Sequence, residues 1–248
     1  MTKIHTESFV VRGTDCDMYR RMRLDALFIA MQEGGEQHAC SLGFGHSAML
    51  ARNLFFVLAR IHVKIDRPPR CGETVVHTTW PGTSNRFFCP RFHTFTLEDG
   101  TPLVTVAALW VILDTAERRI VSPLKVDLGF PDNSDIPEPL SANIRIPALN
   151  EVPVESMRTP VFSEFDINGH VNNTKYIAWL ADALGSDVMK DAFITELVAS
   201  YEKEIRRFEP MILQLSRKDD TYSFKVMSAA GEKHFTASGR LCPEASDE

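Results

Sequence analysis

Residues 163–176 read Ser-Glu-Phe-Asp-Ile-Asn-Gly-His-Val-Asn-Asn-Thr-Lys-Tyr, a polar run that leads directly into an apolar-faced helical pattern. The alternating spacing of Asp166, Asn168 and His170 would place these three side chains on one face if the segment is extended. Imidazole is the side chain best suited to proton transfer near neutral pH. The stretch therefore predicts a reactive site, and a plain turn followed by a helix cap is the alternative.

The start of the following helix adds a second expectation. Asparagine favours turns and N-caps, so Asn172 or Asn173 should begin the helix. The free N–H groups of a helix N-terminus suit a developing oxyanion. We therefore expect an acid, an amide and an imidazole to converge on a helix N-terminus.

An internal repeat organises the chain. Residues 14–22 align with residues 163–171 at an offset of 149 positions (163 − 14), and both segments precede a helical pattern. In the first copy Tyr19 and Arg21 stand where the second copy has its amide and its imidazole. This difference predicts one working site and one copy with other duties.

A second similarity relates residues 60–68 to residues 199–207 at an offset of 139 positions (199 − 60). The first copy therefore carries about ten additional residues between its helix and this strand, around residues 42–53. Both copies are β-rich after their helix. The expected strands cover residues 54–65, 74–80, 86–97, 103–113, 197–205, 211–216, 222–228 and 234–239.

These patterns predict an α+β protein with two tandem copies of a helix plus an antiparallel sheet. The Pro-containing stretch 122–153 separates the copies. We assign residues 1–130 to the N-terminal repeat, residues 131–153 to the connector and residues 154–248 to the C-terminal repeat.

The composition excludes several classes of protein. The chain has 248 residues, 44% hydrophobic and 24% charged, which is typical of a soluble globular protein. Its net charge of −6 argues against general nucleic-acid binding. No apolar run approaches a membrane span and the start is no signal peptide, so we expect a cytoplasmic protein. The five cysteines lack ligand-like spacing, so we expect reduced thiols and no metal.

The sequence resembles the acyl-ACP thioesterases, a family of double hotdog-fold enzymes. The specific match is D-x-N-x-H-V-N-N-x-K-Y at residues 166–176, followed by Tyr-Glu-Lys-Glu-Ile-Arg-Arg at residues 201–207. Weaker matches in the first half are Trp80-Pro81, Arg86, Phe87, the segment 110–114 and Leu-Gly-Phe-Gly at 42–45. The resemblance implies that each repeat wraps its sheet around a long central helix and that the C-terminal repeat is catalytic.

The resemblance also implies an activity and a set of site residues. The reaction is hydrolysis of fatty acyl-ACP thioesters in fatty acid biosynthesis, with acyl carrier protein as partner and without a cofactor. The family's catalytic residues correspond to Asp166, Asn168, His170 and Glu204. We expect Glu204 to act as general base together with His170, Asn168 to position water or bind the oxyanion, and Asp166 to orient His170 or Asn168.

One departure from the family pattern bears on the mechanism. Plant members often have a cysteine directly after the catalytic glutamate, and this chain has Ile205 there. The mechanism should then be attack by water, since nothing in the sequence places Cys71 or Cys242 near the imidazole. Asp17 is a second candidate base, although a turn residue before the first helix is the more ordinary role for it.

Further residues are expected to bind the substrate. The first helix is the natural wall of an apolar acyl tunnel, and basic side chains near both loops suit an acidic carrier protein. The predicted wall residues are Leu27, Phe28 and Met31; the helix-start residues are Asn172 and Asn173; the docking residues are Arg206 and Arg207, with Arg20, Arg21 and Arg23 at the first helix.

Other functions stay open at this point. An acyl-CoA thioesterase could use the same scaffold, because CoA and the carrier protein share the pantetheine arm. A catalytically silent acyl- or carrier-binding module and, less strongly, a hotdog dehydratase are further alternatives. The protein could be a monomeric pseudo-dimer or a homodimer.

Overall fold

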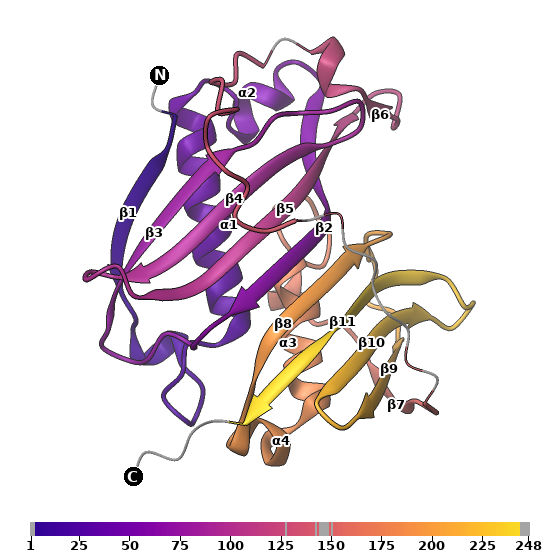
Figure 1. Ribbon diagram of the computed structural model, residues 1–248. Coiled ribbons are helices and arrows are strands. Elements are labelled where there is room, and N and C mark those ends of the chain that lie inside the picture. Colours follow the sequence, from indigo (N-terminus) through magenta and orange to yellow (C-terminus); the bar gives the residue numbers. More distant parts are fainter. Residues whose placement is uncertain (1–2, 127, 142, 144–148, 150, 244–248) are drawn as a thin grey trace.

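The computed structural model describes residues 3–126, 128–141, 143, 149 and 151–243. In this part of the chain a single 11-stranded sheet runs in the order β1-β3-β4-β5-β2-β8-β11-β10-β9-β7, with β6 paired to β5 (Figure 1). The strands are β1 (His5–Val10), β2 (Leu54–Ile65), β3 (Thr74–Pro81), β4 (Cys89–Leu97), β5 (Pro102–Asp114), β6 (Ile120–Val121), β7 (Val154–Arg158), β8 (Ala192–Tyr201), β9 (Met211–Lys218), β10 (Thr221–Ser228) and β11 (Lys233–Pro243).

The helices are fewer and lie against the sheet. They are α1 (Leu24–Ser41), α2 (His46–Leu50), α3 (Asn173–Leu184) and α4 (Ser186–Asp191), with short 3-10 helices at Gly13–Asp15, Pro123–Lys125 and Phe162–Glu164. All strand pairings are antiparallel. The predicted α+β architecture, with a helix and an antiparallel sheet in each repeat, is confirmed.

The two repeats join through their innermost strands. From the centre outward, the N-terminal half reads β2-β5-β4-β3-β1 and the C-terminal half reads β8-β11-β10-β9-β7. The pairing of β2 with β8 places His62 opposite Val198, and Ile61 opposite Ala199. Helices α1 and α3 also contact each other. The chain therefore builds, within one polypeptide, the two-fold arrangement of a dimer.

Both central helices bury an apolar stripe against the sheet. Leu27, Phe28 and Met31 of α1 are each at most 2% exposed, and Trp179 and Leu180 of α3 are fully buried. Spacing of three and four residues places such side chains on one helix face. They share one hydrophobic core with inward-facing residues of both halves of the sheet, so burial of apolar surface holds the two repeats together.

The strand predictions are largely correct, but boundaries of three strands are wrong by three residues or more. Strand β4 begins at Cys89 rather than at residue 86, because the Asn85 side chain accepts hydrogen bonds from the N–H groups of Phe87 and Phe88 and closes a turn. Strand β8 covers Ala192–Tyr201 rather than residues 197–205, and β11 ends at Pro243 rather than at residue 239. The edge strands β1 and β7 and the short strand β6 were not predicted.

The alignment of the second halves of the repeats also needs correction. Glu202 N–H donates to the carbonyl of His234, and Asp66 N–H donates to the carbonyl of Leu103. These two hydrogen bonds occupy the same place in the two repeats. Their donor residues are 136 positions apart (202 − 66), whereas the sequence comparison gave an offset of 139. The first repeat therefore has 13 additional residues (149 − 136) between its loop and this point. By this offset the counterpart of Glu204 is residue 68, a proline.

The described residues contain no helix that is both long enough and apolar enough to cross a membrane.

Candidate functional site

The segment around His170 is a closed turn and not an extended strand. Phe165 and Val171 form an isolated β-bridge across it, and the N–H of Asp166 donates to the carbonyl of His170 at 2.8 Å. One carboxylate oxygen of Asp166 accepts from the N–H of Asn168 at 2.8 Å and of His170 at 3.1 Å. Gly169 completes the turn with φ +71°, a conformation that suits glycine. The extended conformation that would place Asp166, Asn168 and His170 on one face therefore does not occur.

The same turn recurs in the first repeat. One carboxylate oxygen of Asp17 accepts from the N–H of Tyr19 and of Arg21, both at 2.9 Å. Arg20 takes the position of the glycine and has φ +66°. The offset of 149 positions therefore holds for the backbone of the turn, and the repeats differ in the side chains that the turn presents.

The turn of the second repeat opens onto a cavity of about 760 Å³. Asp166, Asn168, His170 and Glu204, the four residues predicted as catalytic, all line this cavity. The sequence predicted that Glu204 lies on a strand. It lies instead on the irregular segment after β8. The backbone joins that segment to the turn, because Val171 N–H donates to the carbonyl of Ile205 at 2.9 Å.

The carboxylate of Glu204 is half-exposed and lies between two arginines. It forms ion pairs with Arg206 and, at 3.4 Å, with Arg118 of the N-terminal repeat. Burial on its own would raise the pKa of Glu204, but its own backbone, Arg206 and His170 outweigh burial and lower that pKa from its ordinary value. Glu204 is therefore an anion at neutral pH, and His170 is close enough to act on its charge.

The start of α3 is occupied mainly by structural contacts. Asn172 is the N-cap, as predicted, and its side-chain oxygen accepts from the N–H of Thr174 at 2.9 Å. The N–H of Asn172 donates to the carbonyl of Glu164. Asn172 does not line the cavity, whereas Asn173 does. The prediction that Asn172 contacts substrate is therefore not supported, because the helix cap uses its side chain and the carbonyl of Glu164 accepts its N–H.

The apolar wall of this cavity comes mainly from strands and from the turn before β4, rather than from α1. Residues 55–59 of β2, Val111 and Leu113 of β5, and Phe87 and Phe88 line it. Leu27 and Phe28 instead pack in the shared core, and Met31 lines a separate small cavity beneath α1. The three residues on α1 do not line the cavity at His170, because their stripe faces the sheet.

Two tyrosines of this cavity were not predicted as site residues. Tyr176 is 2% exposed and burial raises its pKa above the ordinary value, so its phenol stays protonated. The hydroxyl of Tyr201 donates to the carbonyl of Asn173 at 3.2 Å. Tyr176 lies within the quoted motif, where its helical spacing reads as core and gives no separate signal.

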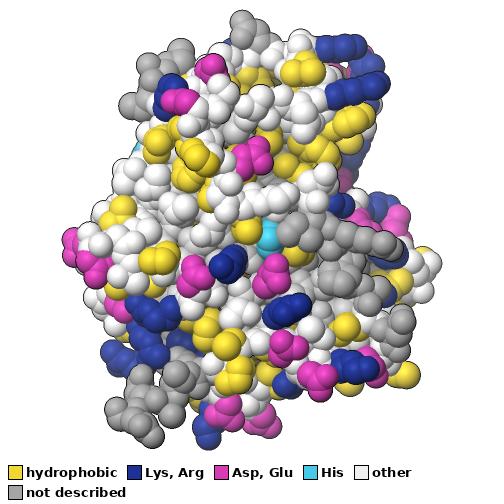
Figure 2. Space-filling view, in the orientation of Figure 1, with side chains coloured by type: hydrophobic (Ala, Val, Ile, Leu, Met, Phe, Trp, Pro, Cys, Tyr) yellow, Lys and Arg dark blue, Asp and Glu magenta, His cyan; other side chains and the backbone are white. Residues whose placement is uncertain are grey.

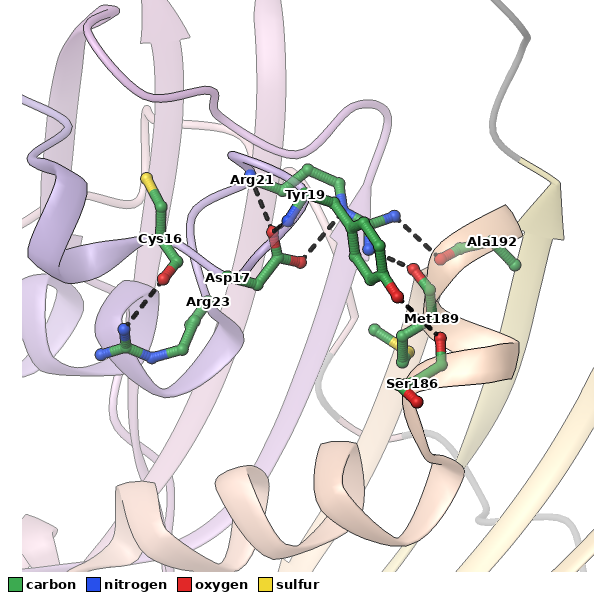
Figure 3. A network of polar contacts seen from close by, with 8 residues as sticks. All are labelled: Cys16, Asp17, Tyr19, Arg21, Arg23, Ser186, Met189 and Ala192. Atoms are coloured by element: carbon green, nitrogen blue, oxygen red, sulfur yellow. Dashed lines mark hydrogen bonds and ion pairs between the residues drawn. The ribbon is translucent and has the colours of Figure 1, made fainter.

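A second cavity, of about 530 Å³, lies at the corresponding turn of the first repeat. Arg21 takes the place of His170 and is 2% exposed. Figure 3 shows its guanidinium between the carboxylate of Asp17 and the carbonyls of Met189 and Ala192 in the C-terminal repeat. Arg21 thus joins the two repeats, and the expectation that it docks a partner is wrong because it is buried and ion-paired.

The counterpart of Glu204 in this second cavity is Pro68, which also lines it. Tyr19 occupies the place of Asn168 and donates through its hydroxyl to the carbonyl of Ser186 at 3.1 Å (Figure 3). At the positions that match His170 and Glu204, the first repeat therefore has an arginine and a proline, neither of which can take a proton from water. Asp17, the second candidate base, is used by the turn and by Arg21.

The remaining predicted docking arginines lie at the surface. Arg206 lines the cavity and pairs with Glu204, whereas Arg207 is 81% exposed and pairs with Glu209. Arg20 and Arg23 are also exposed. On the face of the molecule that Figure 2 shows, basic and acidic side chains are interspersed over the C-terminal repeat. Docking by these residues stays a prediction.

Thiols and metal ligands do not contribute to the cavity at His170. Cys71 and Cys242 are free thiols and do not line it. Within the described part of the chain, no group of three His, Cys, Asp or Glu side chains is arranged to hold a metal ion.

Comparison with known proteins places the chain in a family. The family model for the acyl-ACP thioesterase N-terminal domain matches residues 2–125, and the model for the C-terminal domain matches residues 150–238. A chloroplastic palmitoyl-acyl carrier protein thioesterase of Cuphea hookeriana is 25% identical over 231 residues, covering 87% of this chain and 55% of the relative. A chloroplastic dodecanoyl-acyl-carrier-protein hydrolase of Cinnamomum camphora is 28% identical over 219 residues, covering 81% and 56%. The chain thus spans about half the length of the curated relatives it matches.

Solved structures share the whole fold. An acyl-ACP thioesterase from Bacteroides thetaiotaomicron superposes with a TM-score of 0.88 at 22% identity, covering 97% of this chain and 98% of the other. The 12:0-ACP thioesterase of Umbellularia californica gives a TM-score of 0.85 at 24% identity, covering 98% and 99%. The predicted double hotdog fold is confirmed. The two family models together cover most of the sequence, and the chain belongs to the acyl-ACP thioesterase family.

Proposed function

We propose that this protein hydrolyses the thioester between a fatty acyl chain and acyl carrier protein, in the cytoplasm and within fatty acid biosynthesis. The observation that carries the proposal is the cavity in which His170, Asn168 and Glu204 meet an apolar wall supplied by the other repeat. Membership of the family supports the choice of substrate. The products are the free fatty acid and the carrier with its phosphopantetheine thiol.

The chemistry follows from the groups in the cavity. Water attacks the carbonyl carbon of the thioester and gives up a proton, the C–S bond breaks, and the thiolate leaving group takes up a proton. Glu204, anionic at neutral pH, accepts the proton from water together with His170. Ile205, directly after Glu204, is 2% exposed and packs in the core, which fits attack by water without an acyl-enzyme.

The turn supplies the remaining functions. Asn168 is exposed at the cavity, where its amide can position the water or donate to the oxyanion. Asp166 acts on the backbone, because its carboxylate holds the N–H groups of Asn168 and His170. Asp166 is therefore a positioning residue in this proposal.

The exposed arginines fit docking of the acidic carrier protein. Arg206 at the cavity rim and Arg207 beside it would meet the phosphate of the pantetheine arm or acidic residues of the carrier. Such contacts act mainly on the rate of association, so their loss should raise KM more than it lowers kcat.

The test is release of free fatty acid from acyl-ACPs and acyl-CoAs of graded chain length, with wild type and His170→Ala. We expect His170-dependent release from acyl-ACPs, with a loss of about 10²–10³-fold in the variant. Faster release from acyl-CoAs would favour the CoA-ester alternative. Binding of acyl-ACP without release from either donor would leave a silent binding module.

A further inference from the structure

A small cavity of about 90 Å³ lies beneath α1, inside the N-terminal repeat. Met31, Gln32 and Gly35 of α1 line it from above, and strand residues that include His93 and Trp110 line it from the sheet side. Phe56 lines both this cavity and the one at His170. Phe56 is thus part of the wall between the two cavities, and an acyl chain that crossed this wall from the proposed site would enter the cavity beneath α1 with its distal part.

A row of polar side chains, partly exposed at Glu7 and buried at both histidines, ends at this cavity. The Glu7 carboxylate lies 3.1 Å from Nδ1 of His77, and Nε2 of His77 lies 3.0 Å from Nδ1 of His93. His77 is 0% and His93 is 1% exposed. Among the described residues, Nε2 of His93 has no hydrogen-bond partner. The row therefore leaves one buried polar atom unsatisfied at the cavity.

The positions of the imidazole protons in this row follow from the carboxylate of Glu7 at its outer end. Burial lowers the pKa of His77 and, more strongly, of His93, so both rings are neutral at neutral pH. A carboxylate only accepts hydrogen bonds, so Nδ1 of His77 carries the proton and its Nε2 accepts from Nδ1–H of His93. Nε2 of His93 is then an acceptor that requires a donor.

The cavity also presents donors that require an acceptor. Nε1 of Trp110 and Nε2 of Gln32 are buried and have no partner among the described residues. An indole N–H can only donate. Leaving such buried groups unpaired is costly, so a ligand group that both donates and accepts would be bound preferentially.

Arg91 adds a buried positive charge at the same place. Its guanidinium, 9% exposed, lies 3.3 Å from Nδ1 of His38 and donates to the hydroxyl of Thr79 at 3.2 Å. Burial lowers the pKa of Arg91 to about 10, which still leaves it charged at neutral pH. Glu36, which lines the cavity too, offsets part of this charge.

The backbone of α1 makes room for the polar row. A Cβ on Gly34 would overlap the Glu7 carboxylate and come within 2.6 Å of the His77 ring. A Cβ on Gly35 would lie 3.6 Å from Arg91 and His93. Glycine inside a helix costs about 1 kcal/mol relative to alanine. The helix therefore bears this cost at Gly34 where the row needs the space.

We infer that the cavity beneath α1 binds a hydroxyl group on the acyl chain, so that the preferred substrates are hydroxyacyl thioesters. This inference rests on the proposed function and names its substrate class. The hydroxyl donates its proton to Nε2 of His93 and accepts from the N–H groups of Trp110 and Gln32. Each of the unsatisfied atoms then gains a partner.

Other groups on the acyl chain would fit this cavity less well than a hydroxyl. A methyl group leaves the three atoms unpaired. A keto oxygen satisfies the donors, but it cannot donate to His93. A carboxylate is attracted by Arg91 but meets the lone pair of His93 and the negative charge of Glu36. The order of preference should therefore be hydroxyl, then keto, then unsubstituted chains.

The experiment measures equilibrium binding of free fatty acids and hydrolysis of the matching acyl-ACPs in parallel. Each straight chain is compared with its monohydroxy and oxo counterparts, the substituent being moved along the chain. At one position we expect the hydroxy acid to bind at least about tenfold more tightly than the plain acid, with a similar ratio in kcat/KM. Trp110→Phe and Gln32→Leu should remove most of this preference.

Trp80→Phe is the matched control. Nε1 of Trp80 is also buried without a partner among the described residues, but Trp80 packs with Phe92 and Leu109 and does not line this cavity. This variant should keep the hydroxyl preference. Loss of the preference in Trp80→Phe and Trp110→Phe alike would overturn the inference.

The two measurements separate this inference from the proposed function. Hydrolysis of plain acyl-ACPs with no hydroxyl preference at any position would overturn the inference, leave the proposed function standing, and mean that the cavity holds only water. Tighter binding of a hydroxy acid without hydrolysis of any acyl-ACP would support a hydroxyl-binding cavity, but it would contradict the proposed function and with it the substrate class.

Discussion

Asp17 and Asp166 hold the same turn in the two repeats, each by accepting two backbone N–H groups on one carboxylate oxygen. The copy that carries Arg21 needs this carboxylate as much as the copy that carries His170. The aspartate therefore builds the loop, and we expect the residues two and four positions later to decide what the loop does. A duplicated element could in this way keep its backbone and change its chemistry.

Replacing the two aspartates by alanine should separate activity from stability. Asp166→Ala frees the backbone that positions His170, and we expect kcat to fall by about 10²-fold with a loss of stability of about 1–2 kcal/mol. Asp17→Ala leaves the buried Arg21 without its carboxylate, so we expect a loss of about 3–5 kcal/mol with kcat nearly unchanged. Urea unfolding and acyl-ACP hydrolysis check both. Equal effects of the two variants on kcat would refute the division of roles.

The two adjacent glycines of α1 should respond differently to alanine. Gly34→Ala brings a methyl group against Glu7 and the buried His77 ring, and we expect a loss of about 1–3 kcal/mol. Gly35→Ala meets its neighbours at ordinary contact distance, and the higher helix propensity of alanine should leave it within about 1 kcal/mol of wild type. Thermal unfolding compares the pair. A stable Gly34→Ala protein would show that the polar row can move.

The folded protein should lose stability in acid because of Glu164. Burial by itself would raise its pKa, but hydrogen bonds from Trp179 Nε1, Arg158 and the N–H of Val161 outweigh burial and lower the pKa from its ordinary value of 4.5. A carboxylate whose pKa is lower in the folded state stabilises the protein above its unfolded pKa. This stabilisation should be lost gradually as the pH falls from 4.5, the ordinary pKa of the group, through the lower pKa that Glu164 has in the folded protein.

Glu164→Gln isolates this contribution. We expect the variant to be less stable than wild type at neutral pH by about 1–3 kcal/mol, and to lose less stability than wild type below pH 4.5. Unfolding by urea at a series of pH values measures both. Parallel pH profiles for the two proteins would contradict the assignment.

If Glu204 accepts the proton of the attacking water, Arg206 should influence the pH below which activity is lost. Removing this cation takes away a group that lowers the pKa of Glu204, so Arg206→Met should shift the acid limb of the pH profile of kcat/KM to higher pH. Arg207→Met is the control, because Arg207 pairs with Glu209. An unmoved acid limb in Arg206→Met would mean that Glu204 does not control this limb.

The sequence predicted most of the sheet because its strands are apolar segments bounded by turn residues. It missed β1 and β7, which lie at the two edges of the sheet. All of the β7 side chains except that of Arg158 are exposed, so no alternation marks this strand. It also placed Glu204 on a strand, since nothing in the composition of residues 197–205 marks the end of β8 at Tyr201.

The sequence singled out four residues that line one cavity, but it did not predict how the turn arranges them. Asp166, Asn168 and His170 alternate as they would in a strand, but the Asp166 carboxylate closes a turn that periodicity cannot reveal. The apolar stripe with Leu27 and Phe28 reads alike whether it faces a core or a tunnel. The row from Glu7 to His93 depends on the registers of β1, β3 and β4, which are tertiary facts.

The most direct test of the account compares side chains at the same turn in the two repeats. Hydrolysis of a single acyl-ACP is measured with wild type, His170→Ala, Asn168→Ala and Tyr19→Ala, after circular dichroism has shown that each variant is folded. We predict that His170→Ala and Asn168→Ala lower kcat/KM by about 10²-fold or more, and that Tyr19→Ala stays within about threefold of wild type. A Tyr19→Ala loss as large as that of Asn168→Ala, or full activity in His170→Ala, would contradict the claim that only the C-terminal repeat catalyses.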